Sequence, residues 1–351
     1  MVSLDLVKAS NARIASSLPS GLVAVFVGGT SGLGEYTLRK FARYSDQARI
    51  YIVGRSESAA TKIISECKQS GSTADFTFLA VDISLLRNVD IVCDTIKQKE
   101  ETMNILVQSQ GTFDFSSGEF FLSHGGHCTE STTVTTEGIK KAAALTHHSR
   151  VRFITNLLPQ IRAASSLRRV LNIMTGTKEG HFDPEDIQCN NLSIRHFRTH
   201  VSCLNTLSLA SFAEAAPDVS FIHSFSGSVK SGIGREADFL LKALGAVSDL
   251  LGPMHRIPED ESGERHLYLV TSAKYPSRSD GAVSGVPLDD GVTLAVAIEG
   301  ESGSGVYSID EWNESAGPAV VKILQDHRKA GRVKVLMRTT NVEIRRALSS
   351  Q

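Results

Sequence analysis

The amino-acid sequence predicts an α/β fold in which helices cover both faces of a doubly wound parallel sheet. From residue 21 onward, short apolar runs alternate with helical stretches, a pattern typical of parallel strands that are buried on both faces. A glycine-rich turn follows the first apolar run and opens a helix, which is the arrangement of Rossmann-like folds. The 351 residues are enough for one large domain or two ordinary ones.

The expected strands are short runs rich in apolar and β-branched residues, and the first of them is apolar throughout. In chain order they are Leu22–Val27, Arg49–Val53, Phe76–Val81, Asn104–Val107, Arg169–Ile173 and Val219–Ser224. Between successive strands lie stretches with helical character, expected at Leu33–Tyr44, Ala59–Lys68, Val89–Lys99, Thr136–Ile161 and His200–Ala215. This regular alternation predicts that neighbouring strands are joined by crossover helices.

Two segments depart from this alternation. Residues 113–135 are rich in Gly, Ser, Thr and His and are typical of an inserted loop, within a Rossmann domain expected to span 21–235 after an N-terminal segment of 1–20. Residues 236–351 are expected to form a lid and a C-terminal extension packed on the same domain. Within them, Glu236–Leu251 is expected to be an amphipathic helix whose apolar face either lines a substrate pocket or packs on the sheet. Pro318–Ala330 is expected to be a closing helix.

Composition narrows the class of partner. The 37 basic residues are balanced by 38 acidic ones, which argues against a protein that tracks nucleic-acid phosphates. No apolar run approaches the ~20 residues that cross a bilayer, and no secretory pattern precedes the first strand. The five cysteines lack Cys-x-x-Cys spacing and suit reduced thiols. We therefore expect a cytoplasmic protein that binds neither nucleic acid nor membrane, and homo-oligomer formation stays open.

The glycine-rich turn predicts a nucleotide site, because glycines let the backbone approach a pyrophosphate bound at a helix N-terminus. The residues expected to bind the cofactor in this turn are Gly28, Thr30, Ser31, Gly32, Leu33 and Gly34. The second strand is followed by Arg55 rather than by a carboxylate, which favours the 2′-phosphate of NADP over the free ribose of NAD. The alternative is an ordinary surface arginine.

Taken together, these features resemble the short-chain dehydrogenase/reductase family over about residues 21 to 235. The segments 82–90 (DISLLRNVD), 107–111 (VQSQG), 135–145 (TTEGIKKAAAL) and 220–233 (SFIHSFSGSVKSGI) are similar to the fungal branch that accompanies natural-product gene clusters. The resemblance implies that Asp82 and Ile83 contact adenine and that Gly111 closes the turn after the fourth strand. It also implies that the backbone around Val229 approaches the nicotinamide amide.

The family's catalytic tyrosine and lysine are replaced in this chain. Counting back from Ser226-Gly227 places the family's Tyr-x-x-x-Lys on His196 and His200, and residues 52 to 267 contain no tyrosine at all. The serine position falls on Thr175, which keeps a hydroxyl, and the asparagine position falls near Thr146. The two histidines either supply a proton or simply belong to the start of a helix without a catalytic role.

A third cluster, HGGHC at 124–128, has the donor types of a zinc site but no evident fourth ligand, so no metal is expected. Two functions therefore remain open. The first is an NADP-dependent oxidoreductase that acts on a ketone or alcohol of a small apolar polyketide- or terpenoid-like intermediate, with Thr175 binding the carbonyl oxygen. The second is a redox-silent descendant of the fold that isomerises, dehydrates or cyclises its substrate, or merely binds NADP(H).

Overall fold

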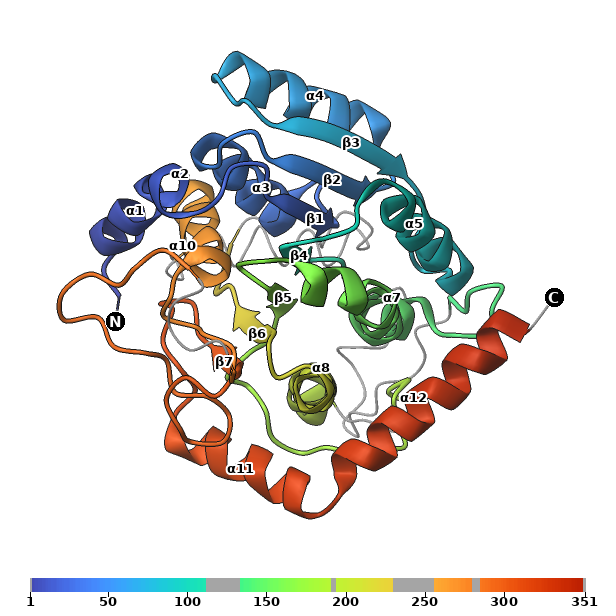
Figure 1. Ribbon diagram of the computed structural model, residues 1–351. Helices are drawn as coiled ribbons and strands as arrows, with labels where there is room; N and C mark the ends of the chain where they lie inside the picture. Colours follow the sequence, from blue (N-terminus) through green and yellow to red (C-terminus); the bar gives the residue numbers. More distant parts are fainter. Residues whose placement is uncertain (1, 112–132, 191–193, 230–255, 280–284, 350–351) are drawn as a thin grey trace, which may run out of the picture.

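A seven-stranded parallel sheet forms the centre of the computed structural model, which describes residues 2–111, 133–190, 194–229, 256–279 and 285–349. The strands follow one another across the sheet in the order β3-β2-β1-β4-β5-β6-β7 (Figure 1). Their bounds are β1 Val23–Val27, β2 Arg49–Gly54, β3 Asp75–Ala80, β4 Ile105–Gln108, β5 Arg169–Met174, β6 Ser220–Phe225 and β7 Val306–Ile309. The order reverses between β1 and β4, so the predicted doubly wound, Rossmann-like fold is confirmed.

Helices cover both faces of this sheet. One face packs against α3 (Gly32–Tyr44), α4 (Glu57–Gln69) and α10 (Glu259–Thr271), with α1 (Leu4–Ala12) outside them and the short α2 (Ile14–Ser17) beside it. The other face packs against α5 (Leu86–Lys99), α7 (Ser149–Ala163) and α8 (Ile194–Ala215). The C-terminal α11 (Pro318–Lys329) and α12 (Arg332–Ser349) lie across α8, and α12 also reaches α5. Successive residues of β1 are buried on opposite faces, which explains its continuous apolar sequence.

The helix expected over Thr136–Ile161 begins later than the sequence suggested. Residues 134–140 form a tight loop, closed by a bridge between Val134 and Lys140 and turning at Gly138, whose φ is +75°. The chain then passes through α6 (Lys141–Ala143) and a π-helical turn, η2 (Ala144–His148), into α7. Helix α8 begins at Ile194, earlier than the expected His200.

Several elements were not expected. Helix α10 carries few strongly apolar residues, yet it is buried because Gly263 lies directly on α3, where a Cβ would be 2.7 Å from the carbonyl oxygen of Tyr36. An ion pair between Lys40 and the buried Glu264, at 2.8 Å, joins the same two helices. Strand β7 and helix α12 also come from the C-terminal extension, and α1 and α2 come from the N-terminal segment. The expected helix Glu236–Leu251 lies outside the described residues.

Helix α12 is tied to the π-helical turn by two buried histidines. The Nε2 atom of His147 lies 2.8 Å from the hydroxyl of Thr340, and the Nε2 atom of His148 lies 2.9 Å from a carboxylate oxygen of Glu343. Burial lowers the pKa of His147 well below its ordinary value. The C-terminal extension therefore supports the part of the fold that precedes α7.

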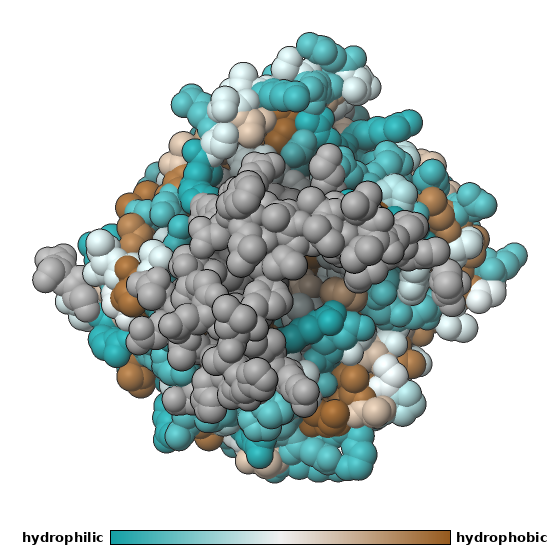
Figure 2. All heavy atoms as spheres, turned by 180° about the vertical axis from the view of Figure 1, so that it is seen from behind, coloured by the Kyte–Doolittle hydropathy of each residue, from teal (hydrophilic) through white to brown (hydrophobic). Residues whose placement is uncertain are grey.

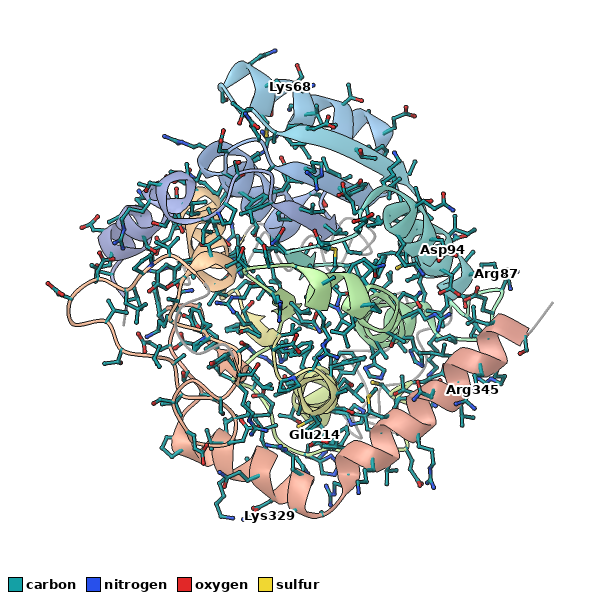
Figure 3. The ribbon with its side chains drawn as sticks, in the orientation of Figure 1. Lys68, Arg87, Asp94, Glu214, Lys329 and Arg345 are labelled. Carbon is teal, nitrogen blue, oxygen red and sulfur yellow. The ribbon has the colours of Figure 1, made fainter. Side chains whose placement is uncertain are left out.

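The surface is mainly polar. Charged side chains such as Lys68, Asp94 and Lys329 point outward from their helices (Figure 3), and the face seen in Figure 2 is mostly hydrophilic around its periphery. Among the described helices, none combines the length and the apolar character that a membrane crossing requires.

Candidate functional site

The turn between β1 and α3 depends on its glycines. Gly28 has a φ of +80° and Gly32 a φ of +60°, both in the left-handed region that favours glycine. A Cβ on Gly28 would lie 2.9 Å from the backbone nitrogen of Gln110, so the turn packs directly on the end of β4. The N-cap residue Ser31 makes no side-chain cap to α3, which leaves the first backbone N–H groups of the helix for an anion.

This turn therefore fits a dinucleotide pyrophosphate. It holds together the predicted residues Gly28, Thr30, Ser31, Gly32, Leu33 and Gly34. It also packs on the end of β2, where a Cβ on Gly54 would lie 2.7 Å from the Cγ2 atom of Thr30.

Replacing Gly34 by alanine is expected to raise the Kd for NADPH by about tenfold or more, the effect of overpacking a tight site. The new Cβ would collide with the hydroxyl of Ser109 and lie 2.6 Å from the carbonyl oxygen of Gly28, so the glycine-rich turn must move. NADPH fluorescence titration measures the change. Gly317→Ala is the matched control, since a Cβ there meets nothing within 4 Å and its φ is −68°. Unchanged affinity in Gly34→Ala would place the phosphates elsewhere.

Arg55 follows β2 and is exposed beside the glycine turn. The next residue, Ser56, caps α4 by accepting a hydrogen bond from the backbone N–H of Ala59 at 3.3 Å. Arg55 thus lies at the carboxyl end of the strand next to β1, where a ribose 2′-phosphate would be reached.

The other predicted cofactor contacts follow three further strands at the same edge of the sheet. Asp82 and Ile83 follow β3; the Asp82 side chain accepts a hydrogen bond from the backbone of Ser84 at 3.0 Å, and Ile83 is buried. Gly111 follows β4, and Val229 follows β6. Because parallel strands all end at one edge, the fold brings these residues to the side of the sheet that carries the glycine turn.

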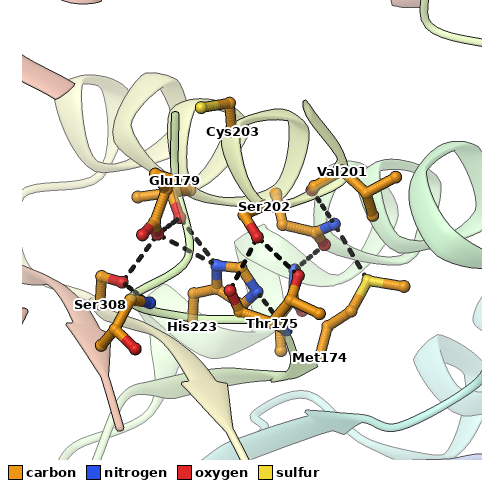
Figure 4. A network of polar contacts seen from close by, with 12 residues as sticks. Met174, Thr175, Glu179, Val201, Ser202, Cys203, His223 and Ser308 are labelled. Atoms are coloured by element: carbon orange, nitrogen blue, oxygen red, sulfur yellow. Dashed lines mark hydrogen bonds and ion pairs between the residues drawn. The ribbon is translucent and has the colours of Figure 1, made fainter. Parts of the chain in front are cut away.

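A pair of hydroxyl groups lies farther along this edge. Thr175 follows β5, and its Oγ1 atom accepts a hydrogen bond of 2.8 Å from Ser202 of α8 (Figure 4). The Ser202 hydroxyl lies at the same distance of 2.8 Å from two carbonyl oxygens, those of Thr175 and Arg198, so its single proton is shared among three acceptors. Thr175 is half-buried, and because its Oγ1 atom is the acceptor in the bond from Ser202, its own hydroxyl proton can be donated to a substrate oxygen.

A buried polar network fixes the position of the loop that carries Thr175 (Figure 4). The backbone N–H of Thr175 donates to Nε2 of His223 at 3.1 Å, which leaves the ring proton on Nδ1, 2.7 Å from the Thr206 hydroxyl. Thr206 and Ser308 both donate to the same carboxylate oxygen of Glu179, at 2.5 and 2.7 Å. Burial lowers the pKa of His223, which keeps the ring neutral.

The two histidines expected at the catalytic positions, His196 and His200, lie on a different face of α8 from Ser202. Both ring nitrogens of His200 contact backbone groups of the preceding loop: Nδ1 accepts from the N–H of Asp183 at 3.3 Å, and Nε2 lies 3.0 Å from the carbonyl oxygen of Asp186. Burial lowers the pKa of His200 to about 4. The ring of His196 stacks on His181, with centroids 4.5 Å apart. The structure therefore does not bring either imidazole to Thr175, whose partner on α8 is Ser202.

Among the residues that the structure describes, no tyrosine takes part in the hydrogen bonds of Thr175 either. The hydroxyls of Tyr44 and Tyr51 bind Glu264 and Glu100 at 3.0 and 2.9 Å. Those of Tyr275 and Tyr307 bind backbone carbonyl oxygens at 2.8 and 2.6 Å. The hydroxyls of these four tyrosines therefore do not fill the tyrosine gap in the sequence.

Sequence reasoning missed a buried arginine beside the site. Arg150 of α7 donates to the carbonyl oxygens of Gln108, Gln110 and Ile173, at 3.0, 2.5 and 3.2 Å, and so joins the carboxyl ends of β4 and β5. Burial lowers the pKa of Arg150 to about 9, because the charged form loses its hydration. The sequence offered no indication of this role, since an arginine within a helix is usually exposed.

Thr146, which spacing placed at the family's asparagine position, lies in the π-helical turn η2. Its carbonyl oxygen accepts a hydrogen bond of 3.2 Å from Asn205 of α8. Asn205 also accepts from Asn172 of β5 at 3.2 Å. The π-helical turn, α8 and β5 therefore meet beside the hydroxyl pair.

The part of the chain that the structure describes contains no group of three or more residues arranged to hold a metal ion. The segment HGGHC at 124–128 lies outside the described residues.

Comparison with known proteins agrees with this geometry. Residues 22–173 match the family model described as short chain dehydrogenase. An oxidoreductase of Emericella nidulans is 37% identical over 333 residues, covering 94% of each chain. A short-chain dehydrogenase/reductase of Stachybotrys chartarum is 27% identical, covering 92% of this chain and 91% of its own.

Solved structures share the fold. The NADP complex of RhlG from Pseudomonas aeruginosa gives a TM-score of 0.53 at 19% identity, covering 79% of this chain and 98% of its own. An L-sorbose reductase of Gluconobacter frateurii, complexed with NADPH and L-sorbose, gives 0.51 at 19% identity, covering 76% and 93%. These likenesses support the fold and no further conclusion.

Proposed function

The chain belongs to the short-chain dehydrogenase/reductase family, in agreement with its resemblance to the fungal branch, and from this premise we propose that it is an NADP(H)-dependent oxidoreductase. Its reaction is the reduction of a ketone, or the oxidation of an alcohol, on a small apolar intermediate of secondary metabolism of polyketide or terpenoid type. The observation that carries the proposal is the pairing, at one edge of the sheet, of a phosphate-binding turn and the Thr175–Ser202 hydroxyl pair.

Each group at the site has a definite task in this proposal. NADP(H), when bound, supplies or accepts the hydride. The N-terminus of α3 holds the pyrophosphate, and Arg55 holds the 2′-phosphate. Ser202 donates to the Oγ1 atom of Thr175 and thereby turns the Thr175 proton toward the substrate oxygen. Relatives named as oxidoreductases support the reaction class.

The proton for the alcohol product needs a source other than the family's tyrosine. His200 is an unsuitable donor, because its nitrogens are engaged with the backbone and its pKa is about 4. Thr175 binds the carbonyl oxygen by a neutral hydrogen bond, and a water molecule in contact with the product oxygen supplies the proton. Slow turnover is the consequence, since a positioned general acid normally contributes about 100-fold to 10,000-fold.

The absence of tyrosine between residues 52 and 267 favours a second candidate, a redox-silent protein of this fold. Such a protein would bind NADP(H) without consuming it and would either isomerise, dehydrate or cyclise its substrate or merely bind the cofactor without catalysis.

Titration with NADPH and a panel of apolar ketones separates the two candidates. Binding followed by ketone-dependent loss of absorbance supports the oxidoreductase. Binding without consumption by any ketone favours the redox-silent protein, and failure of NADPH to bind contradicts both.

Arg55→Asp is expected to change the cofactor preference by about 100-fold toward NADH. The substitution removes the cation that pairs with the 2′-phosphate and adds a carboxylate that repels it but accepts a hydrogen bond from a free 2′-hydroxyl. The ratio of the Kd values for NADPH and NADH measures the change. Lys68→Asp, at an exposed position on α4, makes the same change of charge away from the turn. An unchanged ratio in Arg55→Asp would mean that another residue binds the phosphate.

A further inference from the structure

We propose that the substrate carries an anionic group, such as a carboxylate, and that Lys178 and Arg198 bind this group beside the Thr175–Ser202 hydroxyl pair. The inference rests on the proposed function, because it names the substrate class for the same site. The substrate is then an amphiphile, with an apolar body and one charged end.

Two cations gather on one aromatic ring at the end of β6. The Nζ atom of Lys178 and the Cζ atom of Arg198 each lie 4.8 Å from the centroid of the Phe225 ring. Phe225 and Lys178 are half-buried, and Arg198 is exposed. The faces of aromatic rings attract cations, so Phe225 holds both side chains close to each other and accessible from solvent.

Neither cation has a counter-ion within the described part of the chain. Lys178 and Arg198 form no ion pair there, whereas the nearby Glu179 is buried and accepts hydrogen bonds from Thr206 and Ser308. The shared ring keeps the two charges within about 10 Å of each other, a separation at which salt at ~0.1 M screens them only partly. Their combined field attracts an anion and is unfavourable without one.

The backbones of both residues contact the hydroxyl pair. The N–H of Lys178 donates to the carbonyl oxygen of Thr175 at 3.3 Å, and the carbonyl oxygen of Arg198 accepts from Ser202 at 2.8 Å. Thr175 also forms a bridge with Phe225 itself. An anion bound by these side chains is therefore close to any carbonyl group that Thr175 binds.

The anion belongs to the substrate rather than to the cofactor. In the sheet order, β6 lies three strands from β1, whose glycine turn receives the pyrophosphate. At ~4.8 Å between strands, this separation is roughly 14 Å, and β2, which precedes Arg55, is farther still. The cations are thus distant from both phosphate positions of the proposed cofactor.

The experiment compares the binding of octanoate and octanol, probes that share an apolar chain and differ in charge. Calorimetric titration is done at low salt, with and without NADPH, on the wild type, Lys178→Met and Arg198→Met. We expect octanoate to bind the wild type at least about tenfold more tightly than octanol. Each substitution is expected to raise the Kd for octanoate about tenfold. The Kd values for octanol and NADPH should change by less than about twofold. Lys68→Met, an exposed cation on α4, is the matched control.

Two outcomes would overturn the inference. One is equal affinity for octanoate and octanol in the wild type, which includes no binding of either at about 1 mM. The other is a loss of NADPH affinity in the variants while octanoate binding stays unchanged, which would assign the cations to the cofactor. Failure of the proposed function is distinguishable, because it appears as absent NADPH binding whereas octanoate is also titrated without cofactor.

Discussion

Replacement of Thr175 by valine is expected to lower kcat for NADPH-dependent ketone reduction by about 100-fold to 1000-fold, the cost of losing one donor to a developing oxyanion. Valine has nearly the shape of threonine but no hydroxyl, so the substrate oxygen loses the hydrogen bond on which the proposed reaction depends. The Kd for NADPH should stay unchanged, because the glycine turn lies on β1 and not on β5. Single-turnover kinetics with saturating NADPH measures the effect.

The valine variant is expected to fold normally. Ser202 keeps two other acceptors at 2.8 Å, the carbonyl oxygens of Thr175 and Arg198, so no buried donor is left unpaired. Thr199→Val is the matched control, since Thr199 lies on α8 with Ser202 but its hydroxyl contacts the backbone carbonyl oxygens of His181 and His196. A Thr175→Val protein that retains turnover within about twofold of the wild type would remove the hydroxyl pair from the mechanism.

The cofactor turn could be predicted from the sequence because its determinants are local. Gly28, Gly32 and Gly34 follow an apolar strand and open a helix within a few residues, and backbone geometry alone requires glycine there. Most of the sheet was predictable for the same reason, since each buried strand is recognisable in the sequence as a short apolar run.

The catalytic face of α8 could not be predicted in this way. The spacing of the sequence places on one face of this helix the residues His196, His200, Cys203 and Leu207. A face with apolar residues usually turns toward a sheet. In this chain the polar residues Ser202, Asn205 and Thr206 face the sheet, where Thr175, Asn172 and His223 satisfy them. Only the partners on β5 and β6, distant in sequence, decide which face is turned inward.

Elements that depend on distant partners were missed for a related reason. Helix α10 has a polar composition and is buried through Gly263 on α3 and through ion pairs to Lys40. Helix α12 is fixed by His147 and His148 of the π-helical turn. Such contacts join residues more than 190 positions apart, and no local periodicity reports them.

Acid is expected to destabilise the protein strongly between pH 6.5 and pH 5, where most ordinary carboxylates are still ionised. Burial lowers the pKa of both His200 and His266 from 6.5 to about 4. As pH falls below 6.5 the unfolded chain binds protons that the folded protein does not, so the free energy of unfolding decreases until pH reaches the folded pKa. At pH 5 this linkage amounts to about 2 kcal/mol for each histidine, or about 4 kcal/mol for the two together.

Urea unfolding at pH 7.5 and at pH 5 measures this difference, and a substitution at His266 assigns it. The Nδ1 atom of His266 lies 2.7 Å from the carbonyl oxygen of Ser262, a hydrogen bond that an asparagine amide can replace without titrating. His266→Asn is therefore expected to reduce the loss between the two pH values by about 2 kcal/mol, whatever its effect on stability at pH 7.5. An equal loss of unfolding free energy in the wild type and in His266→Asn would contradict this assignment, since it would mean that His266 is protonated in the folded protein. Because His266 is buried, its protonation would place an uncompensated charge in the core, which is costly.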